Sequence, residues 1–159
     1  MKRFFVILVA VITFSCSSKD DDTVDPLEAY YKEAILGSWA YDTVVVDGQT
    51  YLYDHVDNCT KDLFQFYNQP GKIFDFEETV ILDCDNCAEC ASSSTNLRWE
   101  LDGDIIKFYF GEPLVLIYKI IEVNETSFTY QVRFDYDDDG DEDLLEFTSI
   151  PYDPYNEFE

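Results

Sequence analysis

The sequence between residues 38 and 150 is dominated by short segments in which apolar and polar side chains alternate. Side chains alternate between the two faces of a β-strand, so this pattern predicts strands with one buried and one solvated face. In residues 127–136, the apolar face would carry Phe128, Tyr130, Val132, Phe134 and Tyr136. Strand-like segments occur at eight places, namely residues 38–46, 60–67, 72–82, 96–101, 105–110, 114–123, 127–136 and 144–150.

The joins between these segments are short and carry turn residues, as at Asp47-Gly48 and in residues 102–104 and 124–126. Tight links of this kind make successive strands antiparallel neighbours. Eight such strands bury one apolar face most economically by closing into an up-and-down barrel, because closure leaves no exposed sheet edge. We therefore expect an all-β antiparallel barrel of about eight strands.

One short helix is expected before the strands, over residues 25–36, because Pro26 suits a first helical turn and Gly37 suits a stop. An aromatic content of 17% with only 6 Gly and 5 Pro favours folded sheets over disorder. A domain over residues 27–150 is long enough for one sizeable core, and residues 151–159 would form an acidic tail.

The chain is strongly acidic, with a formal net charge of −24. Such a surface repels the phosphates of nucleic acids and the headgroups of anionic lipids, so no nucleic-acid partner is expected. It attracts divalent cations instead.

The N-terminal segment has the order of features of a bacterial lipoprotein signal. Lys2 and Arg3 precede an apolar run, residues 4–14, that is too short to span a bilayer, and Ser15 precedes Cys16. The pattern predicts a signal peptide over residues 1–15 and acylation of Cys16, with chains such as palmitate as the membrane anchor. An ordinary secretory signal is the alternative, and both would export the chain.

A polar segment follows the cysteine, and residues 16–26 are expected to form a lipidated, disordered tether. Its lysine and aspartates resemble the signal that sends lipoproteins of the Bacteroidetes to the outer leaflet of the outer membrane. The resemblance implies lipid anchoring in the outer membrane with display at the cell surface. A periplasm-facing anchor is the alternative.

Three motifs resemble the lipocalin-like domains of Bacteroidetes lipoproteins. Residues 37–39 resemble the G-x-W that opens the first lipocalin strand, residues 59–62 the C-x-K-D segment, and residues 98–103 the W-x-L-x-G segment. The resemblance covers residues 27–150 and implies that Gly37, Trp39 and Trp99 are signature residues of a lipocalin-like barrel. Trp39 would then plug the closed end, although plain core packing accounts equally for both tryptophans.

Four cysteines remain once Cys16 carries lipid: Cys59, Cys84, Cys87 and Cys90. An even number in an exported chain predicts two disulfides. A bridge from Cys59 into the cluster would join two loops at one end of the barrel, and the resemblance favours Cys59 with Cys84 and Cys87 with Cys90. The C-x-x-C-x-x-C spacing leaves a zinc or iron–sulfur site, or a redox-active pair, as alternatives.

The acidic stretch at residues 135–146 matches the calcium-loop pattern D-x-D-x-D-G-x5-E, in which alternate carboxylates converge on one ion. Strands rather than helices flank it, and an acidic residue occupies the usually apolar position. A solvated last hairpin is the alternative, so calcium is an optional cofactor. The predicted ligands are Asp135, Asp137, Asp139, Asp141 and Glu146.

The sequence lacks two common catalytic motifs, the G-x-S-x-G of serine hydrolases and a phosphate-binding glycine loop. The single histidine, His55, is expected at the rim or in packing, and carboxylate pairs such as Glu77-Glu78 are too common to be informative. We therefore expect no enzyme. The barrel mouth would admit a small apolar or amphipathic ligand between Phe and Tyr side chains. Alternatively, a barrel filled by its aromatics would act through its outer surface, with a protein partner at the cell surface.

Overall fold

The computed structural model describes residues 25–68, 73–82, 90–136 and 139–155. These residues form one helix and nine strands. The elements are α1 (Pro26–Ala34), β1 (Gly37–Val46), β2 (Gln49–Leu52), β3 (Leu63–Phe66), β4 (Phe76–Ile81), β5 (Ser92–Asp102), β6 (Ile105–Tyr109), β7 (Leu114–Val123), β8 (Phe128–Phe134) and β9 (Asp143–Pro151).

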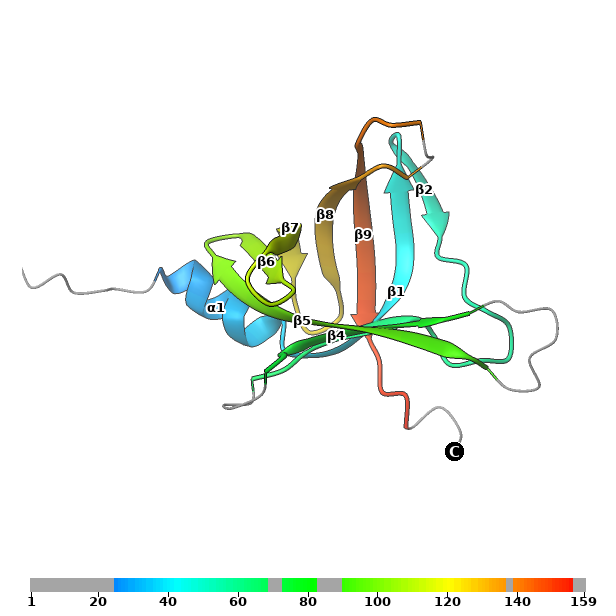
Figure 1. Cartoon of the computed structure of the whole chain (residues 1–159), viewed down its shortest axis with the longest axis horizontal. Helices are drawn as coiled ribbons and strands as arrows, with labels where there is room; N and C mark the ends of the chain where they lie inside the picture. Colours follow the sequence, from blue (N-terminus) through cyan, green and yellow to red (C-terminus); the bar gives the residue numbers. More distant parts are fainter. Residues whose placement is uncertain (1–24, 69–72, 83–89, 137–138, 156–159) are drawn as a thin grey trace, which may run out of the picture.

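The strands form a closed antiparallel barrel (Figure 1). From β3 to β9 each strand pairs with the next, and β1 pairs with both β3 and β9, so the sheet closes on itself. The closed barrel consists of eight strands, β1 and β3 to β9. The expected all-β barrel of about eight strands with a short N-terminal helix is confirmed, and its architecture is consistent with a lipocalin-like fold.

Two separate strands, β2 and β3, follow β1 in the chain and both pair with it. The first half of β1 pairs with β3 and its second half, residues 43–46, pairs with β2. Both pairings are antiparallel, so β2 and β3 run in the same direction along one side of β1, separated by an insertion at residues 53–62. The sequence predicted a strand at residues 60–67, whereas residues 60–62 belong to this insertion.

The helix α1 lies at one end of the barrel (Figure 1). The Asp25 carboxylate caps it by accepting from the Leu27 N–H at 2.9 Å, and Pro26 occupies the first turn as predicted. The Tyr30 hydroxyl donates to the Val123 carbonyl at the end of β7, and Ile35 just after the helix is fully buried. Among the described residues, no helix has the length and apolar character needed to cross a membrane.

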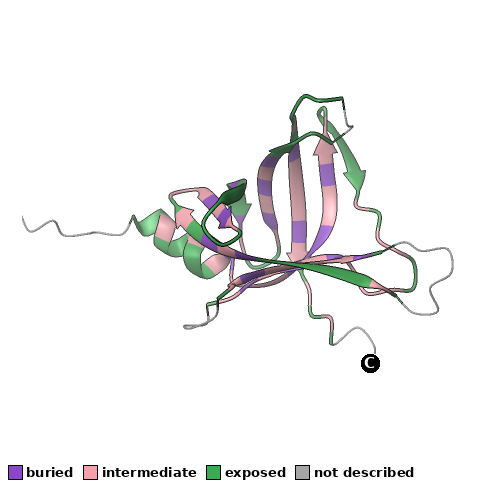
Figure 2. Cartoon of the chain, in the orientation of Figure 1, coloured by how far each residue is buried: buried purple, intermediate pink, exposed green. Residues whose placement is uncertain are grey.

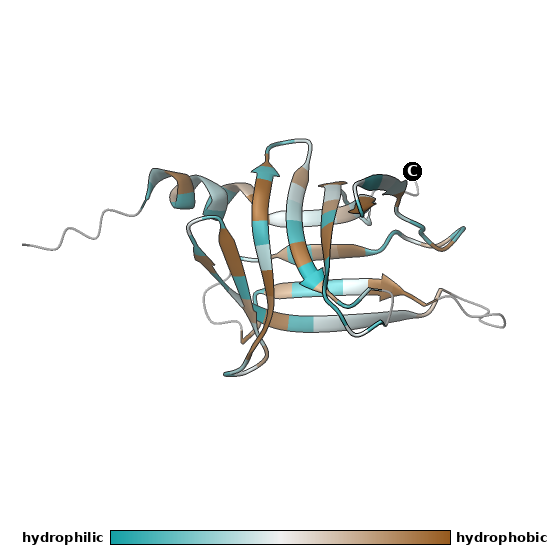
Figure 3. Ribbon diagram, turned by 90° about the horizontal axis from the view of Figure 1, so that it is seen from above, coloured by the Kyte–Doolittle hydropathy of each residue, from teal (hydrophilic) through white to brown (hydrophobic). Residues whose placement is uncertain are grey.

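Alternation along the strands builds the core. Buried and less buried residues follow one another along β8, β9 and β1, and the same banding appears in the hydropathy (Figures 2 and 3). The predicted inward face of residues 127–136 is confirmed for its first three members, which are at most 4% exposed. Bulges in β1 and β7 shift the alternation by one residue at Asp42 and Ile121, so that Val44 and Val123 point inward.

Candidate functional site

The two ends of the barrel differ in how they are covered. At the closed end lie α1 and the turns at residues 103–104 and 124–127. At the open end lie the β1–β2 turn, the insertion at 53–62, and the loops β4–β5, β6–β7 and β8–β9. Figure 1 shows the β1–β2 strand pair extending upward and the β4–β5 strand pair extending to the right, so the strands diverge at this end of the barrel.

Aromatic side chains seal the closed end. Trp39 is 4% exposed, donates from its indole N–H to the Ile35 carbonyl at 2.9 Å and meets Phe128 edge-on. Gly37 has a φ of +120°, a region that favours glycine. The G-x-W motif therefore combines a backbone conformation that needs glycine with a buried tryptophan side chain. The other fully buried rings of this layer are Phe64, Phe66, Phe76 and Phe108.

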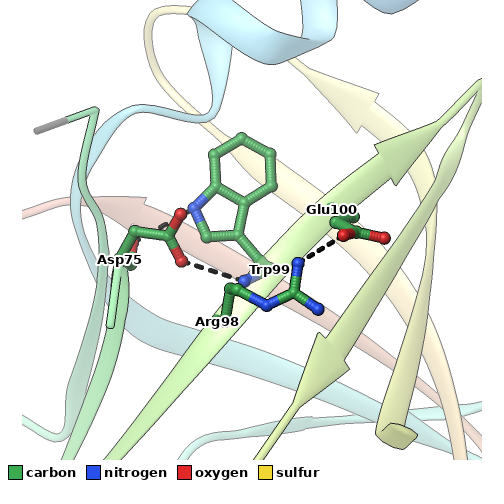
Figure 4. A network of polar contacts seen from close by, with 4 residues as sticks. All are labelled: Asp75, Arg98, Trp99 and Glu100. Carbon is green, nitrogen blue, oxygen red and sulfur yellow. Dashed lines mark hydrogen bonds and ion pairs between the residues drawn. The ribbon is translucent and has the colours of Figure 1, made fainter. Parts of the chain in front are cut away.

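The second signature tryptophan, Trp99, fastens the start of β4 to β5 (Figure 4). Its backbone N–H donates to the Asp75 carboxylate at 2.9 Å, and its indole N–H donates to the Asp75 carbonyl at 3.1 Å. Burial raises the pKa of Asp75, and the hydrogen bond from Trp99 opposes that rise. On the outer face, Arg98 forms an ion pair with Glu100.

Next to the buried Phe side chains of the closed end, towards the open end, lies a layer of tyrosine side chains. This tyrosine layer also contains an inward-facing carboxylate. The Tyr41 hydroxyl donates to the Glu78 carboxylate on β4. Tyr118 and Tyr130 stack with ring centroids 4.1 Å apart. On the other side, Tyr53 stacks on Tyr41 at 4.7 Å. The barrel therefore changes from apolar to polar at this level.

The tyrosines of this layer stay protonated well into alkaline solution. Burial raises the pKa of Tyr41 and Tyr130 well above 10.0, and charge interactions with neighbouring tyrosines and with Glu78 add to the rise. Burial likewise raises the pKa of Tyr118, with Glu78 as the next contribution. At neutral pH these hydroxyls are uncharged, and that of Tyr41 donates to Glu78.

The position of Glu78 follows from strand register. Glu78 lies opposite the fully buried Phe64 on β3 and opposite Thr95 on β5. Residues directly opposite one another in a sheet share a face, so Glu78 points into the barrel. The signal was present in the sequence, because strict alternation from Phe76 to Val80 puts Glu78 on the same face as these two apolar residues. The sequence interpretation nevertheless treated Glu78 only as one of many carboxylates.

Above the tyrosine layer, inward-facing side chains are open to solvent. Ser93 and Thr95 on β5 and Phe134 on β8 lie on the inner face by alternation, yet each is exposed. Tyr51 on β2 shares a face with the buried Val44 and is 50% exposed. The inner surface of the barrel is therefore accessible from this end down to the level of Glu78, which is itself half-buried.

The open end continues sideways into a groove between β7 and β8. Their pairing begins at Lys119 and Gln131, and the parts of both strands nearer the open end lie apart. The groove has a volume of about 620 Å³. Apolar and polar side chains both line it. They are Leu114, Val115, Leu116, Ile117, Val132 and Leu144, together with Lys119, Gln131, Arg133 and Glu142. A hollow of this size and character is in the range of small-molecule sites.

The insertion between β2 and β3 is held by Asp62, which is 4% exposed. One carboxylate oxygen accepts from the Ile81 N–H at 2.6 Å and the other from the Tyr53 hydroxyl at 3.0 Å. The Asp62 N–H donates to His55 Nδ1 at 3.1 Å, so Nε2 carries the ring proton and donates to the Tyr41 carbonyl at 2.8 Å. Both ring nitrogens of His55 are thus engaged in packing the insertion.

A disulfide joins Cys59 to Cys90, with their Cα atoms 5.7 Å apart. It ties the insertion to the β4–β5 connection, so the predicted link between two loops at one end is confirmed. The pairing of Cys59 with Cys84, and of Cys87 with Cys90, is wrong, because the register of the β4–β5 hairpin brings Cys90 beside the insertion. Cys84 and Cys87 lie outside the described residues, as does the lipid site Cys16.

The predicted calcium ligands lie at the same end, but the described ones do not converge. Asp135 accepts from the N–H groups of Asp139 and Gly140, and Asp139 accepts from that of Asp141. Glu146 lies on the outer face of β9 and accepts from Gln131 at 2.9 Å. No group of three potential ligands forms among the described residues, and Asp137 lies outside them. Calcium binding stays a prediction.

No protein-family model, curated protein or solved structure matches this chain. The resemblance to lipocalin-like lipoproteins therefore stays a prediction beyond the shared barrel architecture.

Proposed function

We propose that this protein is a lipid-anchored, non-catalytic binding module of the outer membrane, displayed at the cell surface, that holds a small amphipathic ligand in the open end of its barrel. The observation that supports ligand binding is that inward-facing side chains are buried in one half of the barrel and exposed in the other. Aromatic rings fill the closed half, whereas Thr95, Phe134 and Tyr51 offer accessible inward-facing surface in the open half. The groove between β7 and β8, lined by apolar and polar side chains, adds ligand-sized space at that end.

A retained ligand tests the binding function directly. The full chain, purified gently from its exporting host in a mild detergent, is expected to carry a small-molecule adduct in native mass spectrometry. Releasing the adduct by unfolding should leave a protein that refolds without it. A chain that carries no adduct, and that no added amphipathic compound stabilises, would contradict ligand binding.

The anchor rests on the sequence of residues 1–22 alone. A Cys16→Ala variant is expected to lose incorporation of labelled palmitate, with the exported chain released from the membrane fraction. Protease treatment of intact cells should remove the barrel if it is displayed at the surface. Protection from the protease until the outer membrane is opened would instead favour the periplasm-facing alternative.

The filled closed half favours one alternative, a structural or interaction barrel without an internal ligand, stabilised by calcium on its last hairpin. This alternative hypothesis predicts a protein partner at the cell surface. It also predicts that the midpoint of thermal unfolding rises with calcium and falls with chelator. An Asp139→Ala variant should then lose the response to both. Equal midpoints with and without calcium would remove the ion from this alternative.

A further inference from the structure

We infer that the open end of the barrel selects a cationic head group, an ammonium or guanidinium carried by a small organic ligand, and that Glu78 is the residue that binds it. This inference rests on the proposed ligand binding and adds the charge and the contact residue. Glu78 has one described hydrogen-bond donor, the Tyr41 hydroxyl, and faces the solvent-accessible interior.

No cation of the described chain neutralises Glu78. The described residues contain two ion pairs, Arg98 with Glu100 and Lys107 with Asp102, and both lie on the outer face of the barrel. An incoming cation would supply the opposite charge that Glu78 lacks among the described residues. Tyrosine hydroxyls alone provide hydrogen bonds but no opposite charge.

The walls around Glu78 suit an organic cation better than a metal ion. Tyr41, Tyr118 and Tyr130 are at most 5% exposed, so the accessible aromatic rings of this end are the partly buried Tyr53 and the exposed Tyr51 and Phe134. Aromatic faces attract ammonium and guanidinium groups. A divalent metal would need several carboxylate or carbonyl ligands, and no such group exists among the described residues.

The rim adds a long-range preference of the same sign. Among the described residues of the loops at the open end, Lys61 is the one Lys or Arg. Such an excess of negative charge raises the local concentration of cations and disfavours anions. The exposed carboxylates of these loops belong to Asp47, Asp54, Asp57, Glu112, Asp135, Asp139, Asp141 and Glu142.

Three water-soluble probes of similar size test the charge preference. The full chain, held in lipid nanodiscs and labelled with fluorotyrosine, is titrated with benzyltrimethylammonium, 2-phenylethanol and phenylacetate while ¹⁹F spectra are recorded. Benzyltrimethylammonium should bind at least tenfold more tightly than the other two and should shift the resonances of Tyr41, Tyr53 and Tyr118. Equal binding of the neutral or anionic probe would overturn the charge preference but leave ligand binding in place.

Matched glutamine variants test the residue. Glu77 neighbours Glu78 but points outward, where it accepts from the Tyr67 hydroxyl at 3.1 Å. Glu78→Gln should weaken binding of benzyltrimethylammonium about tenfold, and Glu77→Gln should leave it unchanged, with both variants folded by thermal midpoint. Equal loss in both variants would show general attraction to the acidic surface and overturn the inference. Failure of all three probes would overturn it too, and the adduct experiment then judges ligand binding separately.

Discussion

The closed and open halves of this barrel are built from the same strands with the same alternation, yet they differ in what the inward positions carry. In the closed half the inward residues Phe66, Phe76 and Phe108 are at most 1% exposed. In the open half Thr95 and Phe134 also face inward, but they are exposed. An inward position in a barrel therefore becomes core only where an opposite wall or a cap is close enough to cover it.

The largest expected effect is a truncation in the closed half. Phe66→Ala removes a ring that meets Phe76, Trp99, Phe108 and Phe128, and it should lower the free energy of unfolding by about 3–5 kcal/mol. Urea unfolding followed by fluorescence measures the change. Tyr51→Ala, at a half-exposed inward position of the open half, should cost less than about 1 kcal/mol. Equal losses of unfolding free energy in the two variants would contradict the difference in packing between the closed and open halves.

The disulfide is the main covalent constraint described in the open half. The double variant Cys59→Ser/Cys90→Ser opens a link between residues 31 apart and should lose about 3–4 kcal/mol of stability, because the unfolded chain gains freedom. Hydrogen exchange should rise first in the insertion and in the β4–β5 hairpin, while the closed end keeps its protection. Uniform acceleration over both halves would contradict a local role.

A smaller effect is expected from the buried carboxylate of the insertion. Asp62→Ala leaves the Ile81 N–H and the Tyr53 hydroxyl without their acceptor, which should cost about 2 kcal/mol. The exposed Asp57 in the same insertion provides the control, and Asp57→Ala should change stability by less than about 0.5 kcal/mol. Chemical denaturation of the two variants in parallel makes the comparison.

The smallest effect concerns alkaline solution. The pKa of Tyr130 is raised in the folded protein, so its contribution to stability is complete below pH 10 and is lost as the pH rises beyond the unfolded-state value of about 10. Between pH 10 and 11, Tyr130→Phe should therefore lose about 1 kcal/mol less stability than the unmodified chain. Parallel curves of stability against pH for the variant and the unmodified chain would contradict the raised pKa of Tyr130.

Much of the architecture could be predicted from the sequence, because alternation and turn residues are local signals. The helix with its Asp25 cap, most of the strands and the closing of the sheet followed from them. The strand β2 and the insertion after it were missed, because the pairing of residues 49–52 with β1 depends on a partner strand and not on local composition. The wrong partner for Cys59 has the same origin, since hairpin register decides which cysteine comes near.

The candidate site was predicted only in outline. A mouth lined by Phe and Tyr was expected, but Glu78 was not singled out, although alternation from Phe76 puts it on the inner face. The sequence could not show that Tyr41 meets Glu78, because the two lie 37 residues apart on strands that are not paired with each other. Their contact depends on barrel curvature, which carries side chains across the interior.

By itself, the sequence indicated the inward face of most strands and the closing of the sheet, because alternation and turn residues are local signals. The bulges in β1 and β7 that shift the alternation came only from the structure. Only the tertiary structure decided which inward positions are sealed and which remain open, and which cysteine meets Cys59. These outcomes depend on distances across the barrel. They brought Glu78 into a layer of tyrosines at the accessible end, where a cation is the missing partner that we propose.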